Sequence, residues 1–431
     1  MRNIRATNGL GSVPPSVSRA TEARPQVTAR RHGVASRLMG PGLVALALTA
    51  AACSSTPAAS STSTSSTSSS SPTISTTSTA SSTTATSTAP STTTTSADPP
   101  GGAIPADFQP SSFTAVSLDE WWLLGTARCL SGSGTCDAIV RTTDGGSSFV
   151  GIPSPPVSAT DVTRLRFANA LDGYAFDPEL WATTNGGTSW TKVATTGEVT
   201  ELEAADGETY ALTCATSSAS CQSVELLSSQ VGSRDWQKVS TPTPVEYHAQ
   251  FALSGQDLYL LAGGENDLLL YSADKGASFV TRVSPRRPGL DCSVTPAADG
   301  TPTLWSAAPT GTEAGAWVSD NGGLTWHTAS PPMAGFPNSL GLAAASSSVA
   351  LAWPGQQISG KLPAAMDRTA NGGKSYSTVL SSAWSVVWAG FSDPARAYAL
   401  VAAMETGARG PTRLAESNNG GVTWHQVVVK S

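Results

Sequence analysis

Five side chains in this sequence have the chemistry of a binding site: Trp121, Trp122, Arg164, Arg286 and Arg287. A guanidinium group binds a carboxylate or phosphate through paired hydrogen bonds, so the arginines could anchor an anionic ligand. The adjacent indoles could stack on a ligand, or one could fill the core while the other contacts a neighbouring structural unit. We predict that these five residues contribute to a binding surface.

Recognisable catalytic motifs are missing from the sequence. It contains no Gly-x-Ser-x-Gly elbow, phosphate-binding loop or dinucleotide fingerprint in the required strand-to-helix context. His248, His327 and His425 are too scattered to form a zinc site with the cysteines. The sequence therefore predicts no catalytic residue, no metal and no cofactor.

Four of the six cysteines form two equally spaced pairs. Cys129 and Cys136 enclose six residues, and so do Cys214 and Cys221. This repetition predicts two disulfides that each close a short loop in an exported protein. Cys292 has no evident partner, and both a buried free thiol and an intermolecular disulfide remain open for it.

Residues 1–53 have the pattern of an export signal. Arginines precede an apolar run at 38–52, which is too short for a stable membrane span and ends at Cys53. The sequence Ala50-Ala51-Ala52-Cys53 resembles a bacterial lipobox, with Ala50 where leucine is usual. The resemblance implies lipidation of Cys53, and ordinary cleavage at an Ala-x-Ala site is the alternative.

The composition divides the rest of the chain at about residue 104. Residues 54–104 are mostly Ser, Thr, Ala and Pro, a composition that buries too little apolar surface to fold, so we predict a disordered stalk. Removing the seven arginines and two acidic residues before position 100 from the totals of 25 and 31 leaves 18 basic and 29 acidic residues. This acidic remainder argues against binding to nucleic acid.

One eight-residue pattern recurs seven times in 105–431: Ser or Thr, any residue, Asp or Asn, any, Gly, any, Ser or Thr, aromatic. The copies start at Thr142, Thr183, Ser228, Ser272, Ser319, Thr369 and Ser417, with successive starts 41, 45, 44, 47, 50 and 48 residues apart. The copy at Ser228 has one extra residue and carries Gln230 in the acidic position. This period matches one four-stranded propeller blade.

These octets resemble the Asp box of the BNR-repeat families, which include sialidases, sortilin-type receptors and photosystem II assembly-factor-like propellers. The Trp121–Trp122 element followed by an octet is most similar to the assembly-factor-like group. The resemblance implies an all-β fold, a seven-bladed β-propeller of four-stranded antiparallel blades over 105–431. It also implies a structural role in a hairpin turn for the residues at the acidic position, which are Asp144, Asn185, Asp274, Asn321, Asn371 and Asn419.

The octets also predict where strands and connections lie. Around the second octet we expect strands at 162–167, 173–176, 180–183 and 190–193. Each octet then joins the third and fourth strands at one end of the ring. The second-to-third and blade-to-blade connections gather at the other end, where proline-rich segments begin at Ile152, Ser284 and Ser330. We predict ligand binding at that end.

Two functions are compatible with these features. The first is a non-catalytic binding or scaffolding propeller, a monomer displayed as a lipoprotein on the outer face of the cytoplasmic membrane, or secreted if Cys53 is not acylated. Its ligand would be a protein or a glycan. The alternative is a sialidase-like glycoside hydrolase acting on extracellular glycans, with Arg164 and Arg286 as anchors. The resemblance favours the first, because residues 105–120 lack the early arginine of sialidases and these enzymes usually have six blades.

Overall fold

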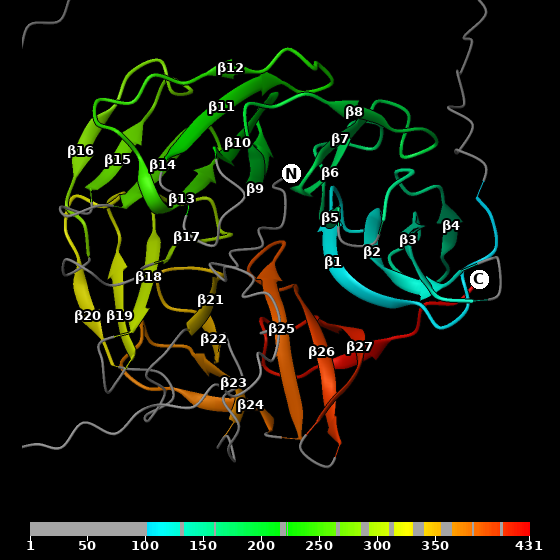
Figure 1. Cartoon of the computed structure of the whole chain (residues 1–431). Coiled ribbons are helices and arrows are strands. Elements are labelled where there is room, and N and C mark those ends of the chain that lie inside the picture. The colour runs from blue at the N-terminus through cyan, green and yellow to red at the C-terminus, as the bar shows by residue number, and fades with distance from the viewer. Residues whose placement is uncertain are drawn as a thin grey trace, which may run out of the picture. The chain divides into compact units, whose positions relative to one another are not determined.

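The computed structural model describes residues 101–431, except 130–132, 159–160, 216–220, 222, 264–267, 286–292, 310–313, 331–339, 355–363, 382 and 406–407. In this part of the chain every regular element is a β-strand. The strands form seven antiparallel sheets of four consecutive strands each, arranged around a common axis (Figure 1). The chain is a seven-bladed β-propeller, which confirms the predicted fold. The predicted signal, Cys53 and the stalk to residue 100 lie outside the described residues.

The blades follow one another along the chain. Blade 1 contains β1 (Gln109–Ala115), β2 (Trp121–Arg128), β3 (Thr135–Thr142) and β4 (Val150–Ile152), and blade 2 contains β5 (Val162–Phe167), β6 (Gly173–Pro178), β7 (Leu180–Thr183) and β8 (Thr191–Val193). Blade 3 contains β9 (Glu198–Ala205), β10 (Glu208–Cys214), β11 (Val224–Gln230) and β12 (Gln237–Lys238), and blade 4 contains β13 (Glu246–Ser254), β14 (Asp257–Gly263), β15 (Leu268–Ser272) and β16 (Val280–Arg282).

The second half of the ring repeats this order. Blade 5 contains β17 (Ser293–Pro296), β18 (Leu304–Pro309), β19 (Ala314–Ser319) and β20 (His327–Ala329), and blade 6 contains β21 (Leu340–Ala344), β22 (Ala350–Pro354), β23 (Ala364–Thr369) and β24 (Ser377–Ser381). Blade 7 contains β25 (Trp384–Phe391), β26 (Ala397–Glu405), β27 (Ala408–Ser417) and β28 (His425–Val427). The strands predicted at 162–167 and 180–183 are confirmed as β5 and β7, whereas β6 extends two residues further and β8 begins one residue later.

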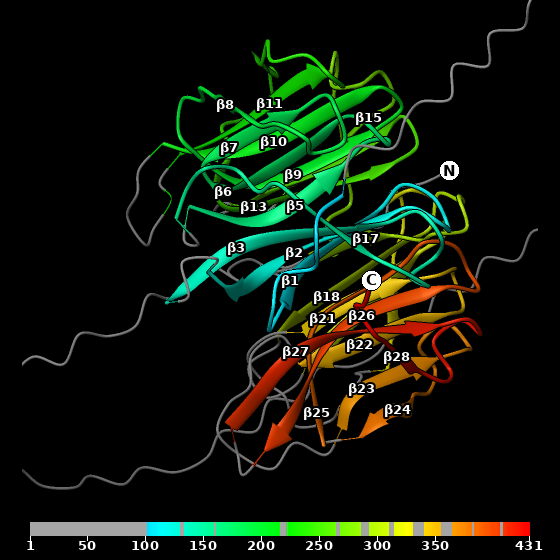
Figure 2. The ribbon, with the colours of Figure 1, turned by 90° about the vertical axis from the view of Figure 1, so that its right-hand side faces the viewer.

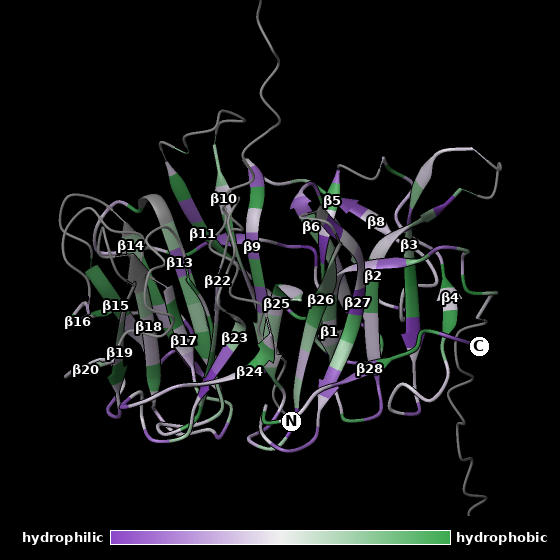
Figure 3. Cartoon of the chain, turned by 90° about the horizontal axis from the view of Figure 1, so that it is seen from below, coloured by the Kyte–Doolittle hydropathy of each residue, from purple (hydrophilic) through white to green (hydrophobic). Residues whose placement is uncertain are grey.

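Both faces of each blade are buried against neighbouring blades. Successive side chains of a strand point to opposite faces, so a strand between two blades must be apolar on both sides. The first five residues of β2 and all five residues of β22 are buried accordingly. Figure 2 shows the ring from the side, and Figure 3 shows that hydrophobic and hydrophilic residues follow one another along the strands.

The ring closes without a shared strand, because blade 1 uses only the first four strands and blade 7 only the last four. Their seam is filled by an aromatic cluster in which Tyr398 stacks on Phe113 with ring centroids 4.8 Å apart and meets Trp121 edge-on at 4.9 Å. The main chain adds a further link, because the Phe149 amide donates a hydrogen bond of 2.8 Å to the Lys430 carbonyl. The residues after β28 therefore fasten the two ends of the ring.

Each octet folds as a hydrogen-bonded hairpin turn between the third and fourth strands. In blade 1 the Thr142 hydroxyl donates to the Asp144 carboxylate and accepts the Gly146 amide, at 2.7 and 3.0 Å. The carboxylate also accepts the amide and the hydroxyl of Ser148, at 2.9 and 2.6 Å. Ser148 is the main reason that the pKa of Asp144 is lowered to about 2. The carboxyl at the acidic position therefore organises the turn.

The octets also connect consecutive blades. The glycine at the fifth position of each octet lies close to a packed neighbour, so that an added Cβ would lie 2.3–3.0 Å from another side chain. A Cβ on Gly187 would lie 2.6 Å from Cδ1 of Ile152 in the preceding blade, and a Cβ on Gly373 would lie 2.3 Å from Cβ of Ala329 in the preceding blade. The Trp190 indole NH further donates to the Pro153 carbonyl of the preceding blade at 2.9 Å.

Candidate functional site

A central depression opens at the end of the ring that carries the octets. It encloses about 1030 Å³ of empty space, part of it open to solvent, and residues from all seven blades line it. Apart from Val231, which lies in the octet of blade 3, these residues lie at or near the carboxyl ends of the first strands, where the chain turns into the second strand of each blade. The sequence predicted the binding surface at the opposite end, so the depression is a difference from that expectation.

The wall of the depression is made mainly of small side chains and main chain. Ala168, Gly255 and Ala298 are typical of the lining, and the charged members are Glu203 and Asp206. Among the described residues that line the depression, none is lysine, arginine or histidine. Small side chains leave backbone amides and carbonyls accessible, and the exposed Asp206 gives the wall a negative charge, since Glu203 is paired with Arg166.

Glu203 is one member of a buried ion pair between blades. Its Oε1 accepts a hydrogen bond of 2.8 Å from Nη2 of Arg166 on β5, and each side chain is less than 7% exposed. The next acidic residue on the same strand, Glu201, reaches the other neighbouring blade, where its Oε2 accepts the Phe251 amide at 3.0 Å. The inner strand of blade 3 thus uses its acidic side chains to hold both adjacent blades.

Arg164, one of the predicted binding residues, is bound by neighbouring groups of the protein itself. Its Nε lies 3.1 Å from Oδ2 of Asp177, and its Nη1 donates to the Thr200 carbonyl at 3.0 Å. The two other predicted arginines, Arg286 and Arg287, lie outside the described residues.

Trp121 and Trp122 have no exposed surface. Because they are neighbours on one strand, they point to opposite faces of blade 1. Trp121 packs in the seam with blade 7, and Trp122 stacks on Phe167 in the seam with blade 2, with ring centroids 3.9 Å apart and planes inclined by 6°. The structure supports the packing role that the sequence left open, and neither ring presents a surface to a ligand.

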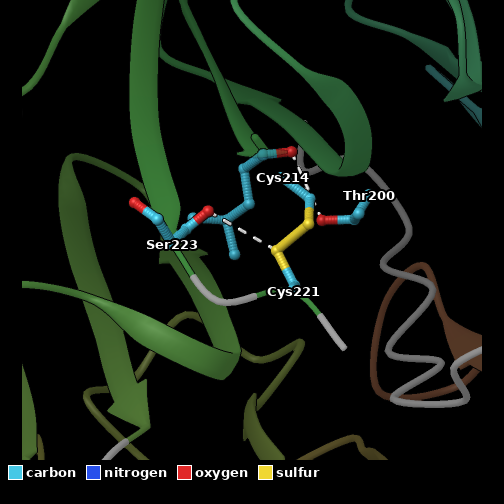
Figure 4. Close-up of a disulfide and its surroundings, with 5 residues drawn as sticks. Thr200, Cys214, Cys221 and Ser223 are labelled. Atoms are coloured by element: carbon cyan, nitrogen blue, oxygen red, sulfur yellow. Dashed lines mark hydrogen bonds between the residues drawn. A yellow bond between two sulfur atoms is a disulfide. The ribbon is translucent and has the colours of Figure 1, made fainter. Parts of the chain in front are cut away.

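The two predicted disulfides are confirmed. Cys129–Cys136 closes the connection between β2 and β3, and Cys214–Cys221 closes the equivalent connection between β10 and β11. Figure 4 shows the second bridge, with Thr200 of β9 beside it. Disulfides persist in oxidising compartments, so they indicate an exported protein. Cys292 lies outside the described residues.

Asp137, next to the first disulfide, is a group that the sequence reasoning missed. Desolvation raises its pKa to about 6, and the nearby charge of Asp161 adds to this increase. Its buried Oδ2 has no hydrogen-bond partner among the described residues. Nothing in the sequence marks this carboxyl, because its environment depends on how blades 1 and 2 pack together.

The described residues contain no group of three or more His, Cys, Asp or Glu side chains able to hold a metal. They also contain no helix with the length and hydropathy needed to cross a membrane.

Comparisons with known proteins give structural neighbours only. No protein-family model matches the chain, and no curated protein matches its sequence. Similar solved structures include YCF48 bound to a D1 peptide, with 14% identity, a TM-score of 0.49, and coverage of 74% of this chain and 95% of that one. YCF48 from Cyanidioschyzon merolae has 13% identity, a TM-score of 0.49, and coverage of 74% and 98%. The propeller domain of the Trilobed protease from Pyrococcus furiosus has 8% identity, a TM-score of 0.49, and coverage of 76% and 98%. At these values the likeness assigns neither a family nor a function.

Proposed function

We propose that this chain is an exported, lipid-anchored propeller that binds a protein partner at the cell envelope and does no catalysis. The observation that carries the proposal is the central depression, which all seven blades line at the octet end of the ring. The depression is open to solvent, and its wall is made mainly of small side chains and main chain from all seven blades. An open surface with accessible main-chain amides and carbonyls suits a segment of a protein.

The charged groups nearby support a binding role rather than hydrolysis. Arg164 and Arg166 are each engaged by a carboxylate. A sialidase needs guanidinium groups that converge on the substrate carboxylate, and these two are already bound to Asp177 and Glu203. The loops closed by the disulfides, at the other end of the ring, are the competing surface for the partner.

The test is to fill the depression and measure partner capture. Ala168 lines the depression and is partly exposed, so Ala168→Trp should occupy it while leaving the blade core unchanged. Ser347→Trp, on an exposed connection at the same end of the ring but outside the lining, is the matched control. Envelope proteins cross-linked to each purified variant would be quantified by mass spectrometry. We expect Ala168→Trp to lose a partner that wild type and Ser347→Trp retain.

Three results would contradict parts of the proposal. Equal capture by both tryptophan variants would place the partner elsewhere, with the disulfide-closed loops as the next surface to test. Turnover of fluorogenic sialosides that Arg164→Ala abolishes would establish a hydrolase instead. Unchanged membrane association of Cys53→Ser in cell fractionation would refute the lipid anchor.

A further inference from the structure

The octet end of the ring carries an excess of negative charge. Fourteen connections lie there, seven between first and second strands and seven between third and fourth strands, and all of them are within the described residues. Their acidic residues are Asp119, Glu120, Asp144, Asp172, Asp206, Asp235, Asp274, Asp299, Asp320 and Asp393, whereas their basic residues are Arg234, Lys275, Lys374 and Arg396. A surface with this imbalance attracts cations and repels anionic partners.

Asp206 is the acidic residue of this set that also lines the depression. It forms the two-residue turn between β9 and β10 with Gly207, both at positive φ (49° and 82°), which exposes its side chain. Lys275 donates to the main-chain carbonyl of Asp206 at 3.0 Å. The Asp206 carboxylate itself has no ion pair or hydrogen bond among the described residues, in contrast to Glu203, which is paired with Arg166.

Two exposed apolar side chains lie in the connections between the first and second strands of blades 1 and 2. Leu118 and Leu171 are 38% and 49% exposed in the first connections of blades 1 and 2. Each lies within three residues of a member of the lining, Val116 and Ala168 respectively. Exposed leucines in these connections provide apolar contact area for a chain that extends from the depression over blades 1 and 2, and blade 3 with its carboxylate is adjacent to blade 2.

We propose that the depression receives a flexible segment of a partner protein in which a lysine or arginine is flanked by apolar residues. The cation pairs with the Asp206 carboxylate, and the apolar neighbours contact Leu118 and Leu171. The described lining contains no lysine, arginine or histidine, and the nearby Lys275 is bound to the main-chain carbonyl of Asp206 rather than to its carboxylate. This inference rests on the proposed function and specifies the chemistry of the ligand.

The test uses a phage-displayed library of random dodecapeptides selected on the purified propeller. We expect selected peptides to contain more lysine and arginine than the starting library and to lose binding to Ala168→Trp. Asp206→Asn keeps the shape of the side chain and tolerates positive φ, so it removes only the charge. We expect it to weaken the selected peptides about three- to fivefold in fluorescence anisotropy. Asp320→Asn, an exposed acidic residue of the same end outside the lining, should change affinity less than twofold.

Selection of peptides without basic residues, equal effects of the two asparagine variants, or no selection of peptides at all would overturn the inference. These outcomes are distinct from failure of the proposed function. If envelope capture still depends on Ala168 while the selected peptides lack basic residues, the depression binds a partner of other chemistry. If capture is independent of Ala168, the site itself is wrong.

Discussion

The contribution of the octets to the packing between blades, and so to stability, can be tested with one glycine substitution. Gly373 in blade 6 has a φ of 77°, and a Cβ there would lie 2.3 Å from Cβ of Ala329 on the outer strand of blade 5. A non-glycine residue in the left-handed region costs roughly 1–2 kcal/mol. Overpacking a rigid contact adds about 1–3 kcal/mol. Because an alanine Cβ cannot rotate away, Gly373→Ala should lower the free energy of unfolding by about 2–5 kcal/mol.

Two other glycines separate these contributions. Gly207 has a φ of 82° with no atom within 4 Å of its added Cβ, so Gly207→Ala should cost only the conformational part, about 1–2 kcal/mol. Gly187 has a φ of 89°, and its added Cβ would meet the flexible end of the Ile152 side chain. The loss of unfolding free energy in Gly187→Ala should therefore lie between those of Gly207→Ala and Gly373→Ala.

Urea unfolding followed by tryptophan fluorescence gives the free energy from the midpoint, with the slope as the check on a shared unfolded state. If Gly373→Ala and Gly207→Ala lost the same free energy within about 0.5 kcal/mol, the close contact between blades would have no energetic role. A loss confined to Gly207→Ala would show that the octet turn tolerates an alanine, contrary to the geometry.

Three further predictions concern the carboxyls and a disulfide. The pKa of Asp137 is about 6 in the folded protein and near 4 when unfolded, so the folded state loses stability as pH rises through this interval. A difference of two pKa units corresponds to about 3 kcal/mol of unfolding free energy, and solvent screening of this half-exposed carboxyl reduces it to about 1 kcal/mol. Asp137→Asn should therefore raise the melting temperature at pH 7.5 and have no effect at pH 3.5; an equal gain at both pH values would exclude the ionisation. The pKa of Asp144 is about 2, so its contribution is present above the unfolded pKa and is lost as pH falls towards 2. Asp144→Asn should flatten the melting temperature between pH 4 and 2, and an unchanged profile would refute this. Replacing Cys214 and Cys221 together with serine should cost about 2–3 kcal/mol in urea unfolding, because the bridge restrains a short loop of the unfolded chain. A reductant should then destabilise the wild type more than the double variant, and equal effects would contradict the assignment.

The features that could be predicted from the sequence are those set by residues close together in the chain. An octet specifies its own turn through a hydroxyl, a short carboxyl or amide side chain and glycines at positive φ, so seven copies predict seven blades. Strand boundaries follow from the turns, which is why β5 and β7 agree with the prediction. The disulfides are also local, because each bridges cysteines seven positions apart.

The site could not be predicted in this way, because it depends on how blades meet. Arg166 and Glu203 are 37 residues apart and pair only because β5 and β9 lie side by side at the axis. The burial of both Trp121 and Trp122 likewise requires a blade on each side of β2. The Asp206–Gly207 pair was a usable signal, since this dipeptide between two strands marks a tight hairpin turn at the octet end.

Two kinds of connection lie at the octet end: the octets themselves and the connections between first and second strands. Their different structural roles explain why we assign binding to the second kind. The octets contact neighbouring blades through the glycine at their fifth position, and six of the seven also keep a hydroxyl and a turn-forming Asp or Asn, so the copies resemble one another. The connections between first and second strands have no such shared task. They range from the two residues 206–207 to the seven residues 297–303, and their composition differs from blade to blade. The octets keep the blades in fixed positions. The variable connections surround the depression, so they can form a specific pattern of charged and apolar contacts without any change in the octets.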